Sequence, residues 1–324
     1  MQPTLRQLES YAHATHAPVG CFFLPQPPEE PLPIPDFRTI GDRAIARPSA
    51  DLLDTLYACQ ARQAWYRDEA LVTGQPPLPF IGSMDLSVPV ERAAGQLRQM
   101  LGFSVQARRE CPSWTEALRL FIAQADALGV LVMVSGVVGS NNNRVLDPEE
   151  FRGFALADAL APLVFINGAD SKSAQMFTLA HELAHLWLGQ SGLSDAGVEG
   201  AGRSQDGAGV EGWGNQVAAE LLVPLPAFVA ALRESEQLDE ALHRLAREFK
   251  VSTLVVLRRM LDAGYLSRDA FWQAFRAEQA RLAAIQTAGS GGGDFYRTTT
   301  ARVGKRFARS LVASTLEGRT LYRD

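Results

Sequence analysis

The stretch Met176–Gly189, MFTLAHELAHLWLG, decides how this 324-residue chain is interpreted. It is an apolar run with helical character, and at its centre stands His181-Glu182-Leu183-Ala184-His185, an H-E-x-x-H array. Because an α-helix turns about 100° per residue, the two histidines lie about 40° apart on one face and roughly 6 Å apart along the axis. Two imidazoles in this arrangement can bind one zinc ion, while Glu182 can act as a general base on water.

A purely structural interpretation of the array is a buried helix whose histidines bond to carbonyl groups while Glu182 faces solvent. The composition argues against it, because the whole chain contains only five histidines and two of them fall in this spacing. The core-facing stripe of the helix is formed by Phe177, Ala180, Ala184 and Trp187. The two histidines therefore lie on a flanking face, where a cleft can form.

The overall composition limits the class of protein. The chain is 47% hydrophobic with a net charge of −5, so it can bury a full core, and its charge does not call for nucleic acid or an anionic membrane. Its three cysteines, Cys21, Cys59 and Cys111, include no C-x-x-C pair, which favours a reducing compartment over a disulfide framework. With no apolar run of about 18 residues, we expect a cytoplasmic protein without a membrane span.

Around the array, hydrophobic periodicity predicts a mostly helical chain with a small β-sheet, an α+β fold. Apolar runs at 129–135, 152–156 and 162–167 are typical of strands. The sheet thus ends directly before the H-E-x-x-H helix, for which Asp170 or Ser171 can serve as N-cap. Helical patterns cover 3–14, 49–100 with a break at 73–83, 114–128, 211–222, 237–249, 252–262 and 267–287.

Three further segments carry their own signals. The Gly- and Ser-rich stretch 191–209 is expected to be a mobile loop. The tight joint at Lys250-Val251 resembles a helix-turn-helix, but an amphipathic helical hairpin is the commoner explanation, so DNA reading is not expected. A Gly hinge at 289–293 precedes a basic segment, which is expected to be a solvated helix face or a docking arm and not a nucleic-acid-binding tail.

A catalytic zinc ion needs three protein ligands and one open position. The metzincin pattern would place Gly and His where this chain has Leu188 and Ser191, so that class is excluded. The third ligand is then expected to be a downstream carboxylate, from Asp195, Glu199, Asp206, Glu211 or Glu220. The first three fall in the expected loop, which is a poor place to hold a ligand.

Glu211 and Glu220 share a helix, but nine residues of separation place them about 180° apart, so only one can face the metal. Glu211 is favoured because Asn215 lies one turn further on the same face, where its amide can orient a histidine ring. Glu220 is otherwise interpreted as a helix-surface residue, and it remains the alternative ligand.

Two motifs resemble the ImmA/IrrE family of bacterial and phage zinc peptidases. FTLAHELAHLWLG at 177–189 is similar to the FTLAHELGH-type helix of the family, and EGWGNQVAAELLVP at 211–224 is similar to its E-x-x-x-N-x-x-A-A-x-L-L-x-P helix. The resemblance implies zinc bound by His181, His185 and Glu211, with Glu182 as general base, in a gluzincin-like core. It also implies an endopeptidase that cleaves a partner transcriptional repressor of Xre type in a stress, phage or toxin–antitoxin-like response.

The similarity extends to longer family members, in which an Xre/Cro-type helix-turn-helix precedes the peptidase. PTLRQLE at 3–9 is similar to the last helix of that DNA-binding unit, and 294–324 is similar to their tail. The chain is therefore expected to lack the DNA-reading helices. The expected division is 1–24 remnant of the helix-turn-helix, 25–48 Pro-rich linker, 49–128 helical region, 129–235 zinc-peptidase core, 236–288 helical helix-turn-helix-like region and 289–324 Gly hinge with basic tail.

Other functions stay open at this point. One is a regulatory protein that binds DNA or a toxin and carries a non-catalytic metal site. Another is metal-dependent hydrolysis of a non-peptide amide. For the peptidase, Arg152 and Tyr265 are the side chains considered as a second oxyanion donor, and the sequence does not single out either.

Overall fold

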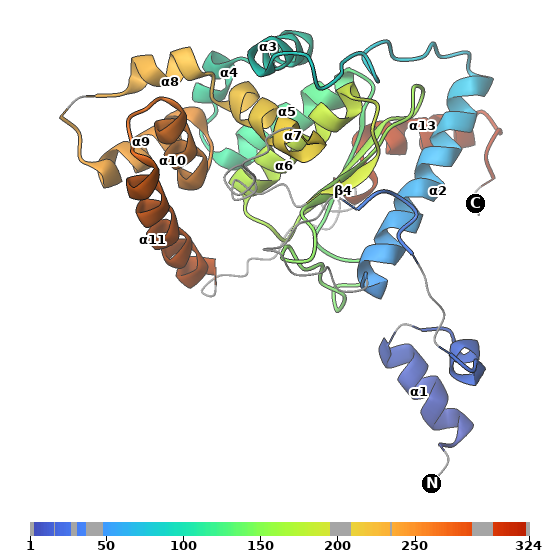
Figure 1. Ribbon diagram of the computed structural model, residues 1–324. Coiled ribbons are helices and arrows are strands. Elements are labelled where there is room, and N and C mark those ends of the chain that lie inside the picture. Colours follow the sequence, from blue (N-terminus) through green and yellow to red (C-terminus); the bar gives the residue numbers. More distant parts are fainter. Residues whose placement is uncertain are drawn as a thin grey trace.

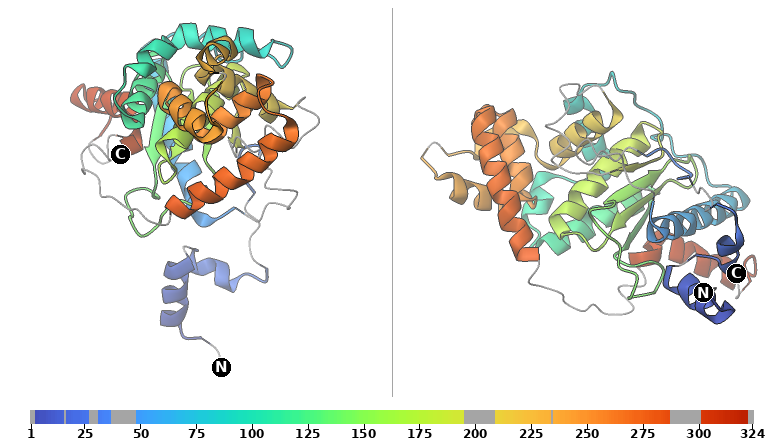
Figure 2. Two further views of the ribbon diagram at one scale, coloured as in Figure 1. Left: turned by 90° about the vertical axis from the view of Figure 1, so that its left-hand side faces the viewer. Right: turned by 60° about the horizontal axis from the view of Figure 1, so that its bottom comes forward.

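The computed structural model describes residues 3–15, 17–26, 31–36, 48–194, 209–233, 235–286 and 301–321 (Figure 1). In these residues it shows a mostly helical fold around a small mixed sheet, which confirms the expected α+β class. Helices cover both faces of the sheet (Figure 2). In Figure 1, the first helix lies apart from the rest of the molecule.

Four short strands form the sheet, in the order β1-β3-β2-β4. β1 (Leu131–Ser135) runs parallel to β3 (Leu163–Asn167). β2 (Gly153–Leu156) runs antiparallel both to β3 and to the edge strand β4 (Gly192–Ser194). The first three strands lie where the apolar runs predict them.

The edge strand β4 carries no strand signal in the sequence. Its residues, Gly-Leu-Ser, begin the stretch expected to be a mobile loop, and that expectation was wrong for 192–194. Leu193 of β4 is fully buried opposite Phe154 of β2, so tertiary pairing and apolar burial override the local composition. Residues 195–208 of the predicted loop lie outside the described residues.

One face of the sheet contributes to the larger of two apolar cores. Val132, Ala155 and Val164 point from three strands into this core, which α5 (Trp114–Ala127) and α6 (Lys172–Trp187) cover. Ser113 caps the start of α5, where its side chain accepts a hydrogen bond from the Glu116 amide at 3.2 Å.

The opposite face belongs to a second apolar core. Met133, Phe154 and Phe165 point from the same strands towards α2 (Ala50–Val72) and α13 (Lys305–Leu316). The right-hand view of Figure 2 shows the sheet between these two groups of helices. Because both faces are covered, the strands appear in the sequence as continuous apolar runs and not as alternating ones.

The remaining helices complete the described fold: α1 (Leu5–Thr15), the 3₁₀ helix η1 (Val19–Phe23), α3 (Val90–Leu101), α4 (Val105–Arg109), α7 (Val210–Leu222), α8 (Leu225–Ala231), α9 (Leu238–Phe249), α10 (Thr253–Asp262) and α11 (Arg268–Gln286). The short helices α4 and α8 have no periodic signal of their own. Searched over the described residues, no single helix is long and apolar enough to cross a membrane, although α7 and α8 meet that test as a pair bent by 49°.

The Pro-rich segment 31–36 is extended, as expected, and it lies along the free edge of β4. The Leu193 amide donates to the Pro35 carbonyl oxygen at 2.9 Å, and Asp36 forms an isolated parallel bridge with Leu193. Ile34 is buried in the second core, whereas Pro33 and Pro35 are exposed. Since proline cannot donate a backbone hydrogen bond, this segment protects the edge of the sheet from further pairing.

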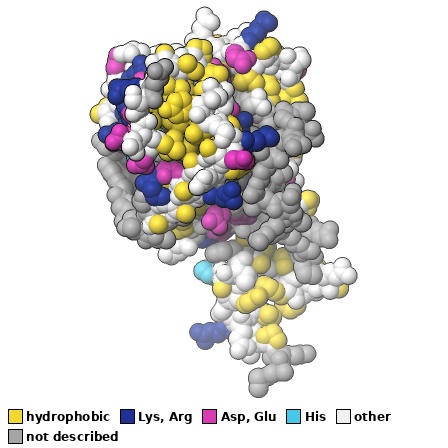
Figure 3. All heavy atoms as spheres, turned by 60° about the vertical axis from the view of Figure 1, so that its left-hand side comes forward, with side chains coloured by type: hydrophobic (Ala, Val, Ile, Leu, Met, Phe, Trp, Pro, Cys, Tyr) yellow, Lys and Arg dark blue, Asp and Glu magenta, His cyan; other side chains and the backbone are white. Residues whose placement is uncertain are grey.

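The helix-turn-helix-like pair α9–α10 packs as an amphipathic hairpin. Most of α10 is buried, including Val256 and Leu257, and both of its arginines engage acidic side chains: Arg258 pairs with Asp262, and Arg259 pairs with Asp262 and Glu220. On the face shown in Figure 3, acidic and basic side chains are intermixed around a hydrophobic area. The second helix of this pair therefore contributes mainly to a core.

The described part of the basic tail docks on the chain itself. α13 lies against α2 and β1, with the buried Phe307 in edge contact with Trp65 at 5.3 Å between ring centroids. Arg306 donates to the Tyr66 hydroxyl at 2.8 Å and to the Asp126 carbonyl oxygen at 2.9 Å. The basic residues of the tail thus anchor a helix that covers one face of the sheet.

We expect Phe307→Ala to lower the free energy of unfolding by about 3 kcal/mol, because it removes a buried ring and its aromatic contact. The matched control is Leu316→Ala in the same helix, where the side chain is 83% exposed and the expected change is within about 0.5 kcal/mol. Chemical denaturation measures both. Equal, small effects of the two substitutions would contradict the docked position of α13.

Candidate metal centre

The helix that carries the H-E-x-x-H array begins at a defined cap. Ser171, and not Asp170, is the N-cap of α6, and its side chain accepts a hydrogen bond from the Ala174 amide at 3.2 Å. Gly189 follows the helix with φ +67°, a left-handed conformation that favours glycine. Both signals could be read from the sequence, and they fix where the histidines fall along α6.

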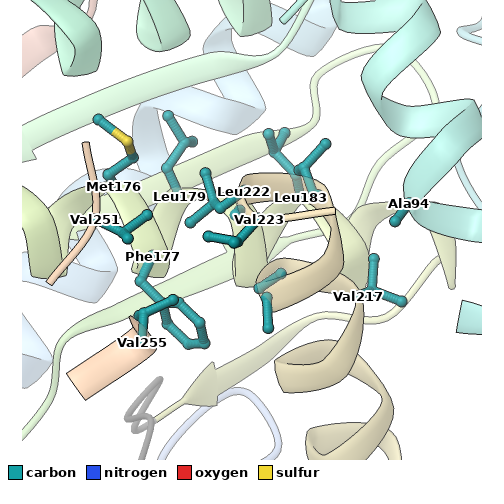
Figure 4. Close-up of a cluster of buried hydrophobic side chains, with 14 of the residues drawn as sticks. Ala94, Met176, Phe177, Leu179, Leu183, Val217, Leu222, Val223, Val251 and Val255 are labelled. Atoms are coloured by element: carbon teal, nitrogen blue, oxygen red, sulfur yellow. The ribbon is translucent and has the colours of Figure 1, made fainter. Parts of the chain in front are cut away.

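α7 packs directly along α6. Figure 4 shows side chains of α6, including Phe177 and Leu183, among Leu222 and Val223 at the end of α7. Gly214 lies where α7 passes the metal centre, since a Cβ atom at this position would be only 3.0 Å from His181 Cε1. The absence of a side chain at Gly214 therefore allows α7 to reach the histidines.

Three side chains from these two helices converge. The Nε2 atoms of His181 and His185 are 2.9 Å apart, and the Glu211 carboxylate lies 3.2 Å from the first and 3.1 Å from the second. Zinc bonds of 2.0–2.1 Å in a tetrahedron place ligand atoms about 3.3 Å apart, so this triangle fits one ion. In the part of the chain that the structure describes, it is the one group of three or more potential ligands that could hold a metal.

The charges in this triangle are strongly coupled. The neighbouring histidines lower the pKa of Glu211 well below its ordinary value, against the opposing effect of burial. Burial lowers the pKa of His185, whereas Glu211 raises the pKa of His181 although burial opposes the rise. One carboxylate and two imidazoles thus form a site that favours a positive charge at its centre, as a metal ion would provide.

Glu182 lies beside the triangle in a closed environment. It is fully buried, and neither carboxylate oxygen has a hydrogen bond of normal geometry among the described residues. Burial raises the pKa of Glu182 to about 8, although the proximity of His181 acts in the opposite direction. A buried carboxylate with so few donors is costly for stability and is typical of a group that acts on water or a substrate.

The sheet reaches the metal centre through Gly153 and Ser194, which pair across β2 and β4. A Cβ atom at Gly153 would lie 2.5 Å from Thr178 Cγ2 and 3.4 Å from Glu182 Oε1. The Ser194 hydroxyl is 3.4 Å from both His185 Nε2 and Glu211 Oε1. Neither residue is predicted from the sequence, because no local signal shows that these strands border the site.

Asn215, expected to orient a histidine ring, is buried one turn after Glu211. It is close enough to His181 to contribute to the raised pKa of that histidine. His181 Nδ1 and Asn215 Oδ1 are nevertheless both buried without a hydrogen bond of normal geometry, so a small adjustment of either side chain would pair them.

Glu220, the alternative ligand, lies at the other end of α7 and points away from the histidines. Its carboxylate forms a buried ion pair with Arg259. Arg98 and Arg108 donate to the carbonyl oxygens of Glu220 and Leu222, respectively. The guanidinium groups of Arg98 and Arg108 satisfy carbonyl oxygens at the C-terminal end of α7, and their positive charges interact favourably with the helix dipole there. Together with the ion pair of Glu220 and Arg259, they anchor the helix that carries Glu211.

The remaining sequence candidates are three acidic residues and two possible oxyanion donors. Asp195, Glu199 and Asp206 lie outside the described residues. Arg152 precedes Gly153 and pairs with Asp170 at 3.4 Å, whereas Tyr265 lies in the turn after α10.

The chain resembles two known protein families. Residues 125–261 match the IrrE N-terminal-like domain (Peptidase_M78). The match supports a protease of the ImmA/IrrE kind and therefore a hydrolase, in a family whose members are metallopeptidases. Residues 303–324 match a domain of unknown function (DUF8813), and no curated protein matches the chain.

The matched peptidase domain runs from the end of α5 to the end of α10, so it contains the sheet, α6 and α7. His181, Glu182, His185 and Glu211 all fall within it. The second match covers all of α13, which completes the core on the opposite face of the sheet.

In this peptidase domain we expect Gly153→Ala to lower the free energy of unfolding by about 1–3 kcal/mol, because the new Cβ would meet the Phe165 carbonyl oxygen at 2.7 Å. The matched control is Gly95→Ala in the middle of α3, where a Cβ atom has open space and the expected change is a gain of about 0.5–1 kcal/mol. Thermal unfolding compares the two. A stable Gly153→Ala variant would contradict the close approach of the β3 backbone to Gly153 of β2.

Proposed function

We propose that this chain is a zinc-dependent endopeptidase of ImmA/IrrE type. The observation that carries the proposal is the buried triangle of His181, His185 and Glu211 beside the Glu182 carboxylate. The match to a peptidase family supports it independently of the geometry. The donor set of two imidazoles and one carboxylate is common for catalytic zinc.

His181, His185 and Glu211 would hold the ion. When bound, zinc would supply a Lewis acid that lowers the pKa of water towards neutrality and polarises the scissile carbonyl. Glu182 would accept the proton of the attacking water and later deliver it to the leaving amine. The positive charge of bound zinc would favour the carboxylate form of Glu182, which accepts the proton. Burial, which raises the pKa of this carboxyl, would let it hold the proton until delivery to the leaving amine.

Two side groups would support this chemistry. Asn215 would pair with the His181 ring and fix its orientation, and Gly153 would leave room for the Glu182 side chain. The proposed location is the cytoplasm, which the three free cysteines support.

The proposed substrate is a partner transcriptional repressor of Xre type, cut in a stress, phage or toxin–antitoxin-like response. The two motifs at 177–189 and 211–224 support this choice through their similarity to the ImmA/IrrE family. The test is to purify the chain, measure its zinc content, and incubate it with the Xre-type repressor encoded nearest to it. We expect about one zinc per chain and a defined pair of repressor fragments, whose formation a chelator stops and added zinc restores.

One observation favours a second function. Glu182 and His181 have no exposed surface, and closed metal sites are typical of structural and not catalytic zinc. The alternative is a regulatory protein that binds DNA or a toxin and carries a non-catalytic metal site. Stoichiometric zinc with no cleavage of any repressor in the same experiment would favour this alternative and count against the peptidase.

A further inference from the structure

Ser194 is a fully buried polar residue whose hydroxyl lies beside three groups of the metal centre, His185, Glu211 and Glu182. It ends the edge strand β4, where it pairs with Gly153 of β2. Its hydroxyl lies 3.4 Å from His185 Nε2 and 3.4 Å from Glu211 Oε1. The side chain thus comes from the sheet, whereas the proposed ligands come from α6 and α7.

Glu211 is the least enclosed of the proposed ligands. Its side chain is 26% exposed, compared with 0% for His181 and 1% for His185. It lies in the first turn of α7, and the N-cap residue Gly209 provides no side-chain hydrogen bond to that turn. The carboxylate therefore needs a partner outside its own helix to hold one orientation.

The partners of the carboxylate change when a metal binds. In the structure, the Glu211 oxygens contact His181 Nε2, His185 Nε2 and the Ser194 hydroxyl. A nitrogen that coordinates a metal has lost its proton and cannot donate a hydrogen bond. Of these three partners, Ser194 alone keeps a proton to donate.

We propose that Ser194 is a positioning residue, which donates a hydrogen bond to Glu211 and holds its carboxylate in the orientation that binds the metal. The inference depends on the proposed function only in requiring a metal at this centre. β4 would thus contribute to the site, because its Ser194 hydroxyl would bond to Glu211, the most exposed of the three proposed ligands. Supporting hydrogen bonds to metal ligands typically contribute about 10- to 100-fold in metal affinity.

The test is metal affinity in the full chain. Zinc binding is measured by competition with a chromophoric chelator, and the ligand geometry is measured by the visible absorption of the cobalt-substituted protein. We expect Ser194→Ala to bind zinc about 10-fold more weakly than the wild type and to show an altered cobalt spectrum. The melting temperature of the metal-free protein should fall only slightly, because the substitution removes one buried hydroxyl with long contacts of 3.4 Å and no apolar side chain.

Ser191 provides the matched control. It immediately precedes β4, and its hydroxyl accepts a hydrogen bond from the Ala157 amide at 2.8 Å, away from the metal centre. Ser191→Ala should leave zinc affinity and the cobalt spectrum as in the wild type. Ser194→Thr, which keeps the hydroxyl, should bind zinc within about three-fold of the wild type.

The inference would be overturned if Ser194→Ala bound zinc within two-fold of the affinity of Ser191→Ala and its cobalt spectrum were unchanged. Equal weakening in Ser194→Ala and Ser194→Thr would also overturn it, because the effect would then come from packing. A wild-type chain that binds zinc but cleaves no repressor would count against the proposed function alone, since the role of Ser194 is measured without turnover.

Discussion

Glu182→Gln is expected to lower the rate of repressor cleavage by about 10³-fold while zinc content stays near one per chain. Glutamine has nearly the same shape as glutamate but cannot accept a proton from water, and general acid–base catalysis typically contributes about 10²- to 10⁴-fold. Cleavage rates under single-turnover conditions and zinc analysis of the same sample measure both quantities. Cleavage at the wild-type rate would remove Glu182 from the proposed mechanism.

The same substitution has a thermodynamic signature that serves as its folding control. Burial raises the pKa of Glu182 from 4.5 to about 8, so the folded, metal-free chain retains a proton that the unfolded chain has released. The stability contributed by this group therefore falls as the pH rises from about 4.5 towards 8. Glutamine does not titrate, and the melting temperature of the metal-free variant should exceed that of the wild type by a margin that grows across this range. A constant margin would contradict the buried position of Glu182.

Glu211 and Glu220 of α7 are expected to respond differently to the same substitution. Glu211→Gln is expected to weaken zinc binding by more than about 100-fold, a larger loss than removal of a supporting hydrogen bond gives. Glu220→Gln should bind zinc normally but lower the free energy of unfolding by about 3 kcal/mol, because it leaves Arg259 without its buried partner. Chelator competition and chemical denaturation measure the two properties.

The two variants control for each other, since they make the same chemical change at opposite ends of one helix. Weak zinc binding by Glu220→Gln together with normal binding by Glu211→Gln would reverse the ligand assignment. Loss of zinc in both variants would mean that the end of α7 near Arg259 governs the position of Glu211, and metal-free melting temperatures would then show how far α7 has loosened.

Periodicity was sufficient to locate most helices. The patterns at 114–128, 211–222 and 252–262 correspond to α5, α7 and α10 within one or two residues. In these segments the apolar stripe, the cap and the turn residues agree, so local preferences and tertiary packing favour the same structure. In β4 and α8 the local sequence does not predict the structure, because these few residues adopt it only through contacts with distant segments.

Part of the proposed site could be predicted from the sequence, because it depends on the geometry of single helices. His181, Glu182 and His185 share one turn of one helix, so their mutual geometry follows from helical periodicity. The choice of Glu211 over Glu220 also rested on helix geometry, and the structure brings Glu211 to the histidines while it pairs Glu220 with Arg259. The basic tail was less readable, since its docking on the sheet depends on Tyr66 and Asp126 from distant parts of the chain.

By itself, the sequence determined the helix of Met176–Gly189, the spacing of its histidines, and the face of α7 from which a third ligand can come. These properties are local, because backbone hydrogen bonds within a helix fix them whatever the rest of the chain does. Only the tertiary structure decided that Ser194 and Gly153 border the same centre and that Glu182 is sealed from solvent. Strand pairing and the packing of α7 on α6 join residues far apart in sequence, and no local pattern encodes such contacts.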